Sequence, residues 1–146
     1  MESHLFVYGT LMIGVESRMA GLLQRNSEWL GSACIPGVLY DLGKYPGAQW
    51  IPEHTERIYG QVFRLEEPQF LLQHLDEYEG IDPRNPDAGE YIRKLVPAVL
   101  EDDNSVVNAW FYHYNGPIKR LKKIESGRYL DYYTQKAAHL NFIKNT

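Results

Sequence analysis

The sequence predicts a single α+β domain in which short strands outnumber helices. Runs with a strand period and runs with a helix period follow one another in the order β, α, several β, α, ββ, α. This order lacks the regular βα alternation of a doubly wound parallel sheet and favours a mixed fold. A chain of 146 residues with 44% hydrophobic and 23% charged residues is also large enough for one buried core. We therefore expect one domain over residues 1–146.

The first half of the chain is expected to contribute three strands and a short helix. A strand over 4–8 is followed by a helix over 16–24 with one apolar face. Residues 28–39 are typical of a strand, with a break at the Pro-Gly pair, and 41–52 are typical of a loop. Residues 58–65 alternate between two faces and predict another strand.

The second half is expected to contribute two helices and a hairpin. Leucines at helical spacing predict a helix over 66–79, and Gly80 is placed to end it as the C′ residue. A loop then leads to two strands, 91–100 and 106–114, which are separated by a polar turn and predict a hairpin. A final helix is expected over 128–142.

Composition excludes several classes of function. A net charge of −4 argues against nucleic acid as the main partner, because phosphate binding needs a basic surface. No apolar stretch approaches membrane-spanning length, and no basic-then-apolar leader opens the sequence. The single cysteine, Cys34, permits no intrachain disulfide and sits in an apolar context typical of a buried side chain. We expect a cytoplasmic protein.

The stretch Val7-Tyr8-Gly9-Thr10-Leu11 joins the first strand to the first helix through a glycine turn. Such a turn can direct backbone N–H groups at an anion or at a developing oxyanion. The alternative is an ordinary βα turn in which the glycine only supplies a permissive φ.

Glu79 is a candidate acid–base residue at the end of the predicted 66–79 helix. A carboxylate there faces the negative end of the helix dipole, and Asp76 adds like-charge repulsion from one turn back. Glu79 also shares the side of the helix that carries the apolar stripe. All three effects raise the pKa of the Glu79 carboxyl, which suits proton transfer. The alternative is a solvated acidic helix end.

Other kinds of chemistry find no support in the sequence. The five histidines show no metal-ligand spacing, and no serine sits in a nucleophile-elbow pattern. We therefore expect no metal and no cofactor.

Several motifs together resemble the γ-glutamylcyclotransferase-like, or AIG2-like, family. The first is the glycine turn of residues 7–11 followed by Gly14, and the second is the pair Leu75-Asp76 with Glu79-Gly80. The resemblance extends in order over about residues 4–135. Further segments that are similar to the family lie at 37–41, 45–47, 60–63, 91–93 and 107–114. One departure is Arg128, which stands where many members carry an acid, so the contacts of that segment stay open.

The resemblance implies a small mixed β-barrel flanked by helices, with one pocket. It also implies a reaction in which the α-amine of a γ-glutamyl compound attacks its own γ-carbonyl, releasing 5-oxoproline and a free amine. Glu79 falls on the family's catalytic glutamate, and Tyr8, Gly9, Thr10 and Leu11 fall on its substrate-binding loop.

Four further side chains are candidates around the pocket. Tyr114 is expected to line it with its hydroxyl, the alternative being a rim or core tyrosine; Tyr45 is expected in a pocket wall, the alternative being a loop anchor. Tyr91 is expected just behind these residues. Arg93 could pair with Asp76 or with a substrate carboxylate, although a surface ion pair is the commoner outcome.

Two other functions are compatible with the same sequence. One is a non-catalytic small-molecule-binding domain on the same fold. The other is a pathway-specific enzyme that removes a γ-glutamyl protecting group by the same chemistry. For the enzyme the expected partner is a small γ-glutamyl molecule, and for the binding domain the expected ligand is 5-oxoproline or glutamate. Nucleic acid and membrane are not expected partners, and the oligomeric state stays open.

Overall fold

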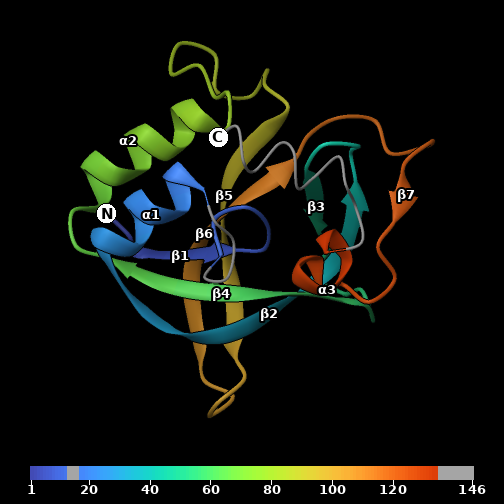
Figure 1. Ribbon diagram of the computed structural model, residues 1–146, viewed down its shortest axis with the longest axis horizontal. Helices are drawn as coiled ribbons and strands as arrows, with labels where there is room; N and C mark the ends of the chain where they lie inside the picture. The colour runs from blue at the N-terminus through green and yellow to red at the C-terminus, as the bar shows by residue number, and fades with distance from the viewer. Residues whose placement is uncertain (13–16, 135–146) are drawn as a thin grey trace.

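The computed structural model describes residues 1–12 and 17–134, in which strands dominate (Figure 1). Within these residues the helices are α1 (Arg18–Arg25), α2 (Pro68–Tyr78) and α3 (Tyr129–Tyr133). The strands are β1 (His4–Val7), β2 (Ser27–Asp41), β3 (Pro46–Trp50), β4 (Arg57–Leu65), β5 (Tyr91–Leu100), β6 (Val106–Tyr114) and β7 (Lys122–Lys123).

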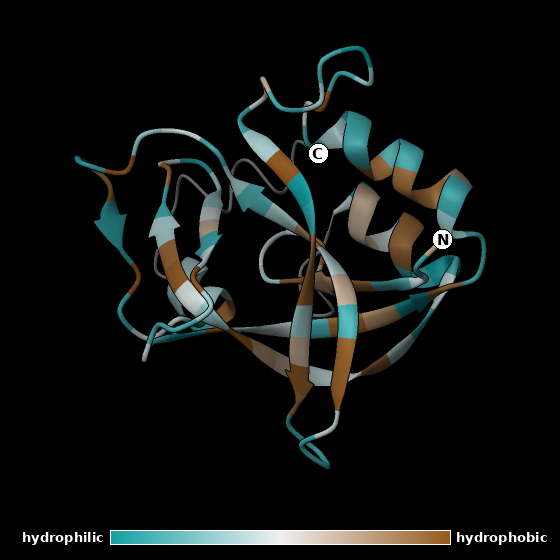
Figure 2. Cartoon of the chain, turned by 180° about the vertical axis from the view of Figure 1, so that it is seen from behind, coloured by the Kyte–Doolittle hydropathy of each residue, from teal (hydrophilic) through white to brown (hydrophobic). Residues whose placement is uncertain are grey.

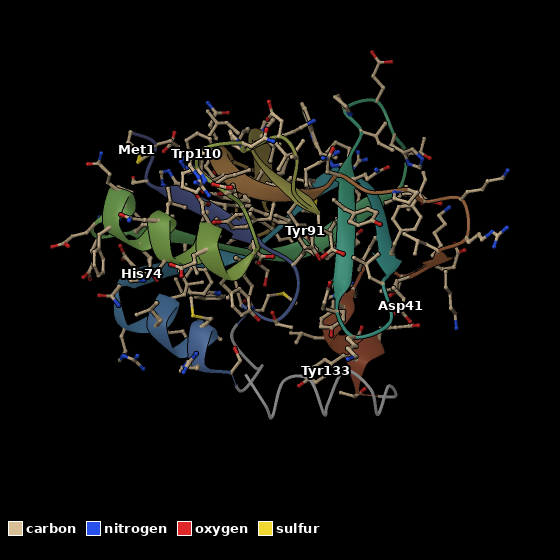
Figure 3. The ribbon with its side chains drawn as sticks, turned by 90° about the horizontal axis from the view of Figure 1, so that it is seen from above. Met1, Asp41, His74, Tyr91, Trp110 and Tyr133 are labelled. Carbon is tan, nitrogen blue, oxygen red and sulfur yellow. The ribbon has the colours of Figure 1, made fainter. Side chains whose placement is uncertain are left out.

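Five of these strands close into a mixed barrel. Antiparallel pairing joins β1 to β4, β4 to β2 and β2 to β3. Parallel bridges then join β3 to β6 and β6 back to β1, the last through Leu5 and Trp110. Next to this bridge, the indole N–H of Trp110 donates to the Glu2 carbonyl (2.9 Å), beside the N-terminus (Figure 3). The expected small mixed β-barrel is confirmed.

The β5–β6 hairpin extends the barrel on one side. Its strands pair in register from Tyr91 with Tyr114 to Val99 with Val106, as the sequence predicted. Figure 2 shows the hydrophilic tip of the hairpin, which corresponds to the polar turn of residues 101–105. The far end of β5 also pairs with β2 at Ala33 and Cys34, so the hairpin is held at both ends.

Strand β2 runs without the break expected at Pro36-Gly37. The Pro36 carbonyl accepts from the Ile51 N–H, and the Gly37 N–H donates to the Glu56 carbonyl (both 3.1 Å), so pairing continues on both sides. Gly37 has a φ of +153°, and a Cβ there would lie only 2.1 Å from the Gln49 carbonyl oxygen. The Pro-Gly pair therefore allows close approach of β3 and does not end the strand.

Strand β3 was expected to be part of a loop. Its residues have weak strand propensity, yet it pairs with β2 over its whole length and with β6 at Ala48. Gly47 packs so closely on Tyr114 that a Cβ would meet the ring at 3.0 Å. Long-range pairing and the packing of small residues override local propensity here.

Helices α1 and α2 lie side by side on one side of the barrel (Figure 1). The Ser17 hydroxyl caps α1 by accepting from the Ala20 N–H (3.1 Å), and Pro68 opens α2 at its first turn. None of the described helices is both long and apolar enough to cross a bilayer. The helix expected over 128–142 is represented by α3, and its part beyond 134 lies outside the described residues.

Candidate active site

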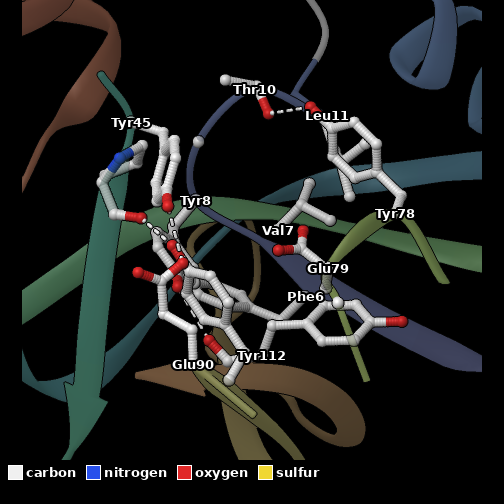
Figure 4. A pocket seen from close by; sticks show the side chains of 14 residues that line it. Phe6, Val7, Tyr8, Thr10, Leu11, Tyr45, Tyr78, Glu79, Glu90 and Tyr112 are labelled. Atoms are coloured by element: carbon white, nitrogen blue, oxygen red, sulfur yellow. Dashed lines mark hydrogen bonds between the residues drawn. The ribbon is translucent and has the colours of Figure 1, made fainter. Parts of the chain in front are cut away.

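The chain encloses a cavity of about 330 Å³ between the barrel and the end of α2 (Figure 4). This volume is in the range of small-molecule sites. The lining comes from the end of β1, the glycine turn, the β2–β3 connection, the end of α2, the start of β5, and β6. The lining residues are Phe6, Val7, Tyr8, Gly9, Thr10, Leu11, Tyr45, Pro46, Tyr78, Glu79, Gly80, Glu90, Tyr91 and Tyr112.

The glycine turn forms one wall of the cavity. The Met12 N–H donates to the Gly9 carbonyl (3.2 Å), which closes a turn with Thr10 and Leu11 at its centre. Among the described residues, no acceptor pairs with the Thr10 or Leu11 N–H. Gly9 does not adopt positive φ; instead, a Cβ on Gly9 would lie 2.8 Å from the Pro46 Cγ. The glycine is therefore explained by the close approach of Pro46 and not by a special backbone conformation.

The end of α2 places Glu79 in the opposite wall. The Gly80 N–H donates to the Glu77 carbonyl (3.1 Å) and the Ile81 N–H donates to the Asp76 carbonyl (2.9 Å), with Gly80 at a φ of +78°. This is a Schellman motif, and it confirms Gly80 as the predicted C′ residue. The motif fixes Glu79 at the C-cap, from where its side chain lines the cavity.

Glu79 has a strongly perturbed carboxyl. Burial, followed by the charges of Glu90 and Asp76, raises its pKa from 4.5 to about 8. The direction and the contribution of Asp76 agree with the sequence analysis, whereas Glu90 was not anticipated. A carboxyl with such a pKa can both accept and release a proton near neutral pH.

Tyrosines dominate the remaining surface of the cavity, and four of their hydroxyls donate to the protein itself. Tyr8 donates to the Tyr112 carbonyl (2.7 Å) and Tyr91 to the Pro46 carbonyl (2.6 Å). Tyr45 donates to a Glu90 carboxylate oxygen, and Tyr112 to an Asp76 carboxylate oxygen (both 2.7 Å). These bonds hold the rings in place, and burial raises the pKa of Tyr45 to about 12, so its hydroxyl stays protonated.

Asp76 is anchored behind the cavity by Arg93. The Arg93 Nε donates to the same Asp76 oxygen that accepts from Tyr112, at 2.9 Å, and the guanidinium lies 4.3 Å from the centre of the Trp110 ring. The two ionic side chains are only 20% and 21% exposed. Arg93 therefore pairs with Asp76, as one of the sequence alternatives proposed, but the pair is largely buried and not on the surface.

The structure brings together all the predicted site residues except Tyr114. Tyr114 is buried beside Tyr91, with ring centres 6.1 Å apart, and its hydroxyl donates to the Pro117 carbonyl (3.2 Å). Its neighbour two residues earlier, Tyr112, lines the cavity instead. Tyr78 and Glu90 also line the cavity, although no sequence pattern indicated a site role for them. Strand alternation places Tyr112 on the same face of β6 as Tyr114 and does not decide between them, and Glu90 follows a loop and carries no pattern.

Two further residues discussed in the sequence lie outside the cavity, Cys34 and Arg128. Cys34 is a half-buried residue of β2, and burial raises the pKa of its thiol. The Arg128 guanidinium stacks 3.8 Å from the centre of the Tyr59 ring, which accounts for a basic residue at that position. Residues 1–12 and 17–134 contain no group of three or more histidine, cysteine, aspartate or glutamate side chains that could hold a metal.

Comparison with known proteins gives a consistent result. A sequence model described as "Gamma-glutamyl cyclotransferase, AIG2-like" matches residues 5–131. The Escherichia coli K12 protein named "Gamma-glutamylcyclotransferase family protein YtfP" is 33% identical over 134 residues, covering 87% of this chain and 96% of the relative.

Solved structures share the fold. The solution structure of E. coli ytfP has a TM-score of 0.59 at 32% identity, covering 88% of this chain and 97% of that one. A mouse AIG2-like protein has a TM-score of 0.62 at 21% identity, covering 85% and 86%, which supports the fold alone. YkqA from Bacillus subtilis has a TM-score of 0.68 at 26% identity; 92% of this chain matches, but only 42% of YkqA is spanned.

Proposed function

The chain belongs to the gamma-glutamyl cyclotransferase, AIG2-like family, and from this premise we propose that it converts a γ-glutamyl amine or γ-glutamyl amino acid to 5-oxoproline and a free amine. The observation that carries the proposal is that Glu79 and the glycine turn form opposite walls of one cavity. The cavity offers an acid–base group on one wall and backbone N–H donors on the other.

To catalyse this reaction, the enzyme mainly has to hold the substrate in a curled conformation and transfer protons. The attacking amine and the γ-carbonyl belong to the same molecule, so a cavity that holds the curled conformer supplies most of the advantage. Glu79 takes a proton from the α-ammonium group, and the freed amine attacks the γ-carbonyl carbon. Glu79 then delivers this proton to the departing nitrogen as the C–N bond breaks, and it takes up the second proton of the ring nitrogen, which leaves with the released amine as that amine becomes an ammonium group. No covalent enzyme intermediate is needed.

The perturbed carboxyl of Glu79 suits both halves of this cycle. A pKa of about 8 lies close to that of an α-ammonium group, so proton transfer between the two is nearly balanced. The Thr10 and Leu11 N–H groups would bind either the substrate α-carboxylate or the oxyanion that forms on the γ-carbonyl.

The proposal is tested by measuring 5-oxoproline release from a panel of γ-glutamyl amines and γ-glutamyl amino acids. E79Q keeps the shape of the side chain but cannot cycle a proton, and is expected to lower kcat by about 100-fold or more. E77Q is the matched control, because Glu77 is an exposed carboxylate on the same helix that does not line the cavity.

Two results would overturn the assignment. One is an E79Q protein that melts like the parent and retains its full rate. The other is the absence of turnover for every panel member, and tight calorimetric binding of 5-oxoproline by such an inactive protein would indicate a binding domain on the same fold.

A further inference from the structure

The cavity is acidic, and this bears on which amine can leave. Among its fourteen lining residues the ionisable acids are Glu79 and Glu90, and none is lysine, arginine or histidine. Arg93 is committed to Asp76 behind the wall. Lys44 adjoins Tyr45 in sequence, but it is exposed and does not line the cavity. A second negative charge on the substrate, beyond its own α-carboxylate, would meet no cationic side chain in this lining.

The tyrosine side chains of the cavity also favour a cationic leaving group over an anionic one. Tyr8, Tyr45, Tyr91 and Tyr112 each donate their proton to a protein acceptor. With their protons committed to the protein, these four hydroxyls do not act as donors toward a ligand. Their rings also present π faces, which attract cations. The side chains of this part of the cavity therefore suit a ligand rich in N–H donors.

Glu90 is held in position at the rim of the cavity. One carboxylate oxygen accepts from the Tyr45 hydroxyl (2.7 Å), and the Glu90 carbonyl accepts from the Asn115 N–H (2.7 Å). The Asn115 side chain also donates to the Gly89 carbonyl (3.1 Å), which fixes the preceding residue. In Figure 4, Glu90 lies beside Tyr45, on the side of the cavity away from Tyr78 and Glu79. An acid–base group at one end and a fixed carboxylate at the other define the two ends of a site.

Resting on the proposed function, we propose that the leaving amine carries a second, cationic group, which Glu90 binds at the rim. The substrate class is then a γ-glutamyl derivative of a diamine or polyamine. The glutamyl part lies between Glu79 and the glycine turn, and the chain of the leaving amine runs past the tyrosine rings to Glu90. Glu90 is a specificity-determining residue in this arrangement and takes no part in proton transfer.

The proposal predicts discrimination among substrates that differ only at the far end. A γ-glutamyl amino acid brings a carboxylate on its leaving group, which Glu90 repels. A neutral alkylamine loses only the ion pair. A diamine gains a charge-assisted hydrogen bond to a carboxylate that is already oriented.

Three γ-glutamyl amides test this order, made from diaminobutane, pentylamine and aminopentanoate. Their leaving amines share one chain of methylenes and end in an ammonium, a methyl and a carboxylate group. We expect kcat/KM to be about 10-fold higher or more for the ammonium compound than for the methyl compound, and lowest for the carboxylate compound. Because Glu90 is exposed, added salt should reduce the preference.

Substitutions at Glu90 test whether this residue causes the preference for the ammonium compound. E90Q should bring the ammonium and methyl compounds within about 3-fold of each other, and E90K should favour the carboxylate compound. Because the charge of Glu90 also raises the pKa of Glu79, the readout is the ratio of kcat/KM between two compounds in the same variant and not the absolute rate. D87N and K44Q are matched controls, because both residues are charged, exposed and outside the lining. Both should keep the parent preference.

The outcomes separate this proposal from the proposed function. Equal turnover of all three compounds, or an ammonium preference that survives in E90Q, would overturn the role of Glu90 and leave the cyclisation intact. Absence of 5-oxoproline from all three, and from the wider panel, would instead remove the proposed function.

Discussion

Glu79 combines a helix C-cap position, burial and two neighbouring carboxylates. The first could be inferred from the sequence, because Gly80 marks the end of the helix and Glu79 precedes it. Asp76 follows from helical spacing alone. Glu90 could not be inferred, because it reaches the cavity through a loop whose path depends on Asn115 and on tertiary contacts. Local periodicity therefore identified the acid but not everything that perturbs it.

The raised pKa of Glu79 makes the stability of the protein depend on pH. Between pH 4.5 and about 8 the folded protein keeps the Glu79 proton, whereas the unfolded chain has lost it. The free energy of unfolding therefore falls as the pH rises through this window. E79Q removes the ionisation, so it should match the parent near pH 5 and exceed it by up to a few kcal/mol near pH 9.

Urea unfolding of the parent, E79Q and E77Q at these two pH values measures the effect. The difference between the parent and E79Q should grow with pH, and E77Q should show no such growth. A parent and E79Q that differ equally at both values would contradict a raised pKa.

Arg93 is a residue whose main expected role is structural. R93M removes the partner of a carboxylate that is only 21% exposed, and also the cation that stacks on Trp110. We expect a loss of about 1–3 kcal/mol in the free energy of unfolding. R84M, which breaks the exposed pair with Asp82, should change it by less than about 0.5 kcal/mol.

The double variant D76N/R93M provides the decisive comparison. It should recover part of the loss, because the side chain at position 76 then no longer carries a largely buried charge without a counter-ion. A single R93M variant that unfolds like the parent would show that the pair contributes nothing to stability.

At the level of elements, the sequence predicted those helices and strands that are stabilised mainly by interactions between residues close in sequence. The α2 helix, the β4 strand and the β5–β6 hairpin follow from apolar period and turn chemistry. The β3 strand could not be predicted, because its residues have little strand propensity and are held by two partners distant in sequence. The roles of Tyr112 and Tyr114 were misjudged for a related reason. The two share one face of β6, and only the position of β3 and Gly47 decides which of them meets the cavity.

The Schellman motif of α2 gives a test at the level of an element. In G80A a Cβ meets no atom within 4 Å, so its cost comes only from the φ of +78°. We expect a loss of about 1 kcal/mol in the free energy of unfolding. Because Glu79 is the neighbouring residue, a shifted helix end should also lower kcat more than it raises KM.

G21A is the control, because its expected effect on the free energy of unfolding is opposite to that of G80A. Gly21 lies inside α1, and its Cβ would meet only the end of the flexible Arg25 side chain, at 3.1 Å. Alanine there should stabilise the protein by up to about 1 kcal/mol. If G80A proved as stable as the parent, the αL cap would not be what ends α2.

For the whole molecule, the sequence predicted one α+β domain, and the resemblance added the barrel. The closure itself could not be read from the residues, since it depends on two single parallel bridges, β3 to β6 and β6 to β1. Nothing in the four-residue strand β1, of which three residues are apolar, specifies the distant strand with which it pairs to close the barrel. The cavity is a property of this closure, because its walls come from both ends of the described chain.

The bridge between Leu5 and Trp110 has a consequence for how the protein reaches its folded state. Tyr8 and Tyr112, 104 residues apart, are joined by a hydrogen bond across the same seam. Contacts so far apart in sequence close large loops and form late in folding. During synthesis the first strand must wait for most of the chain to emerge before it gains its second neighbour. A nascent or truncated chain that ends before β6 would expose the apolar β1 strand and contain no binding cavity, so ligand binding would begin only when the barrel is sealed.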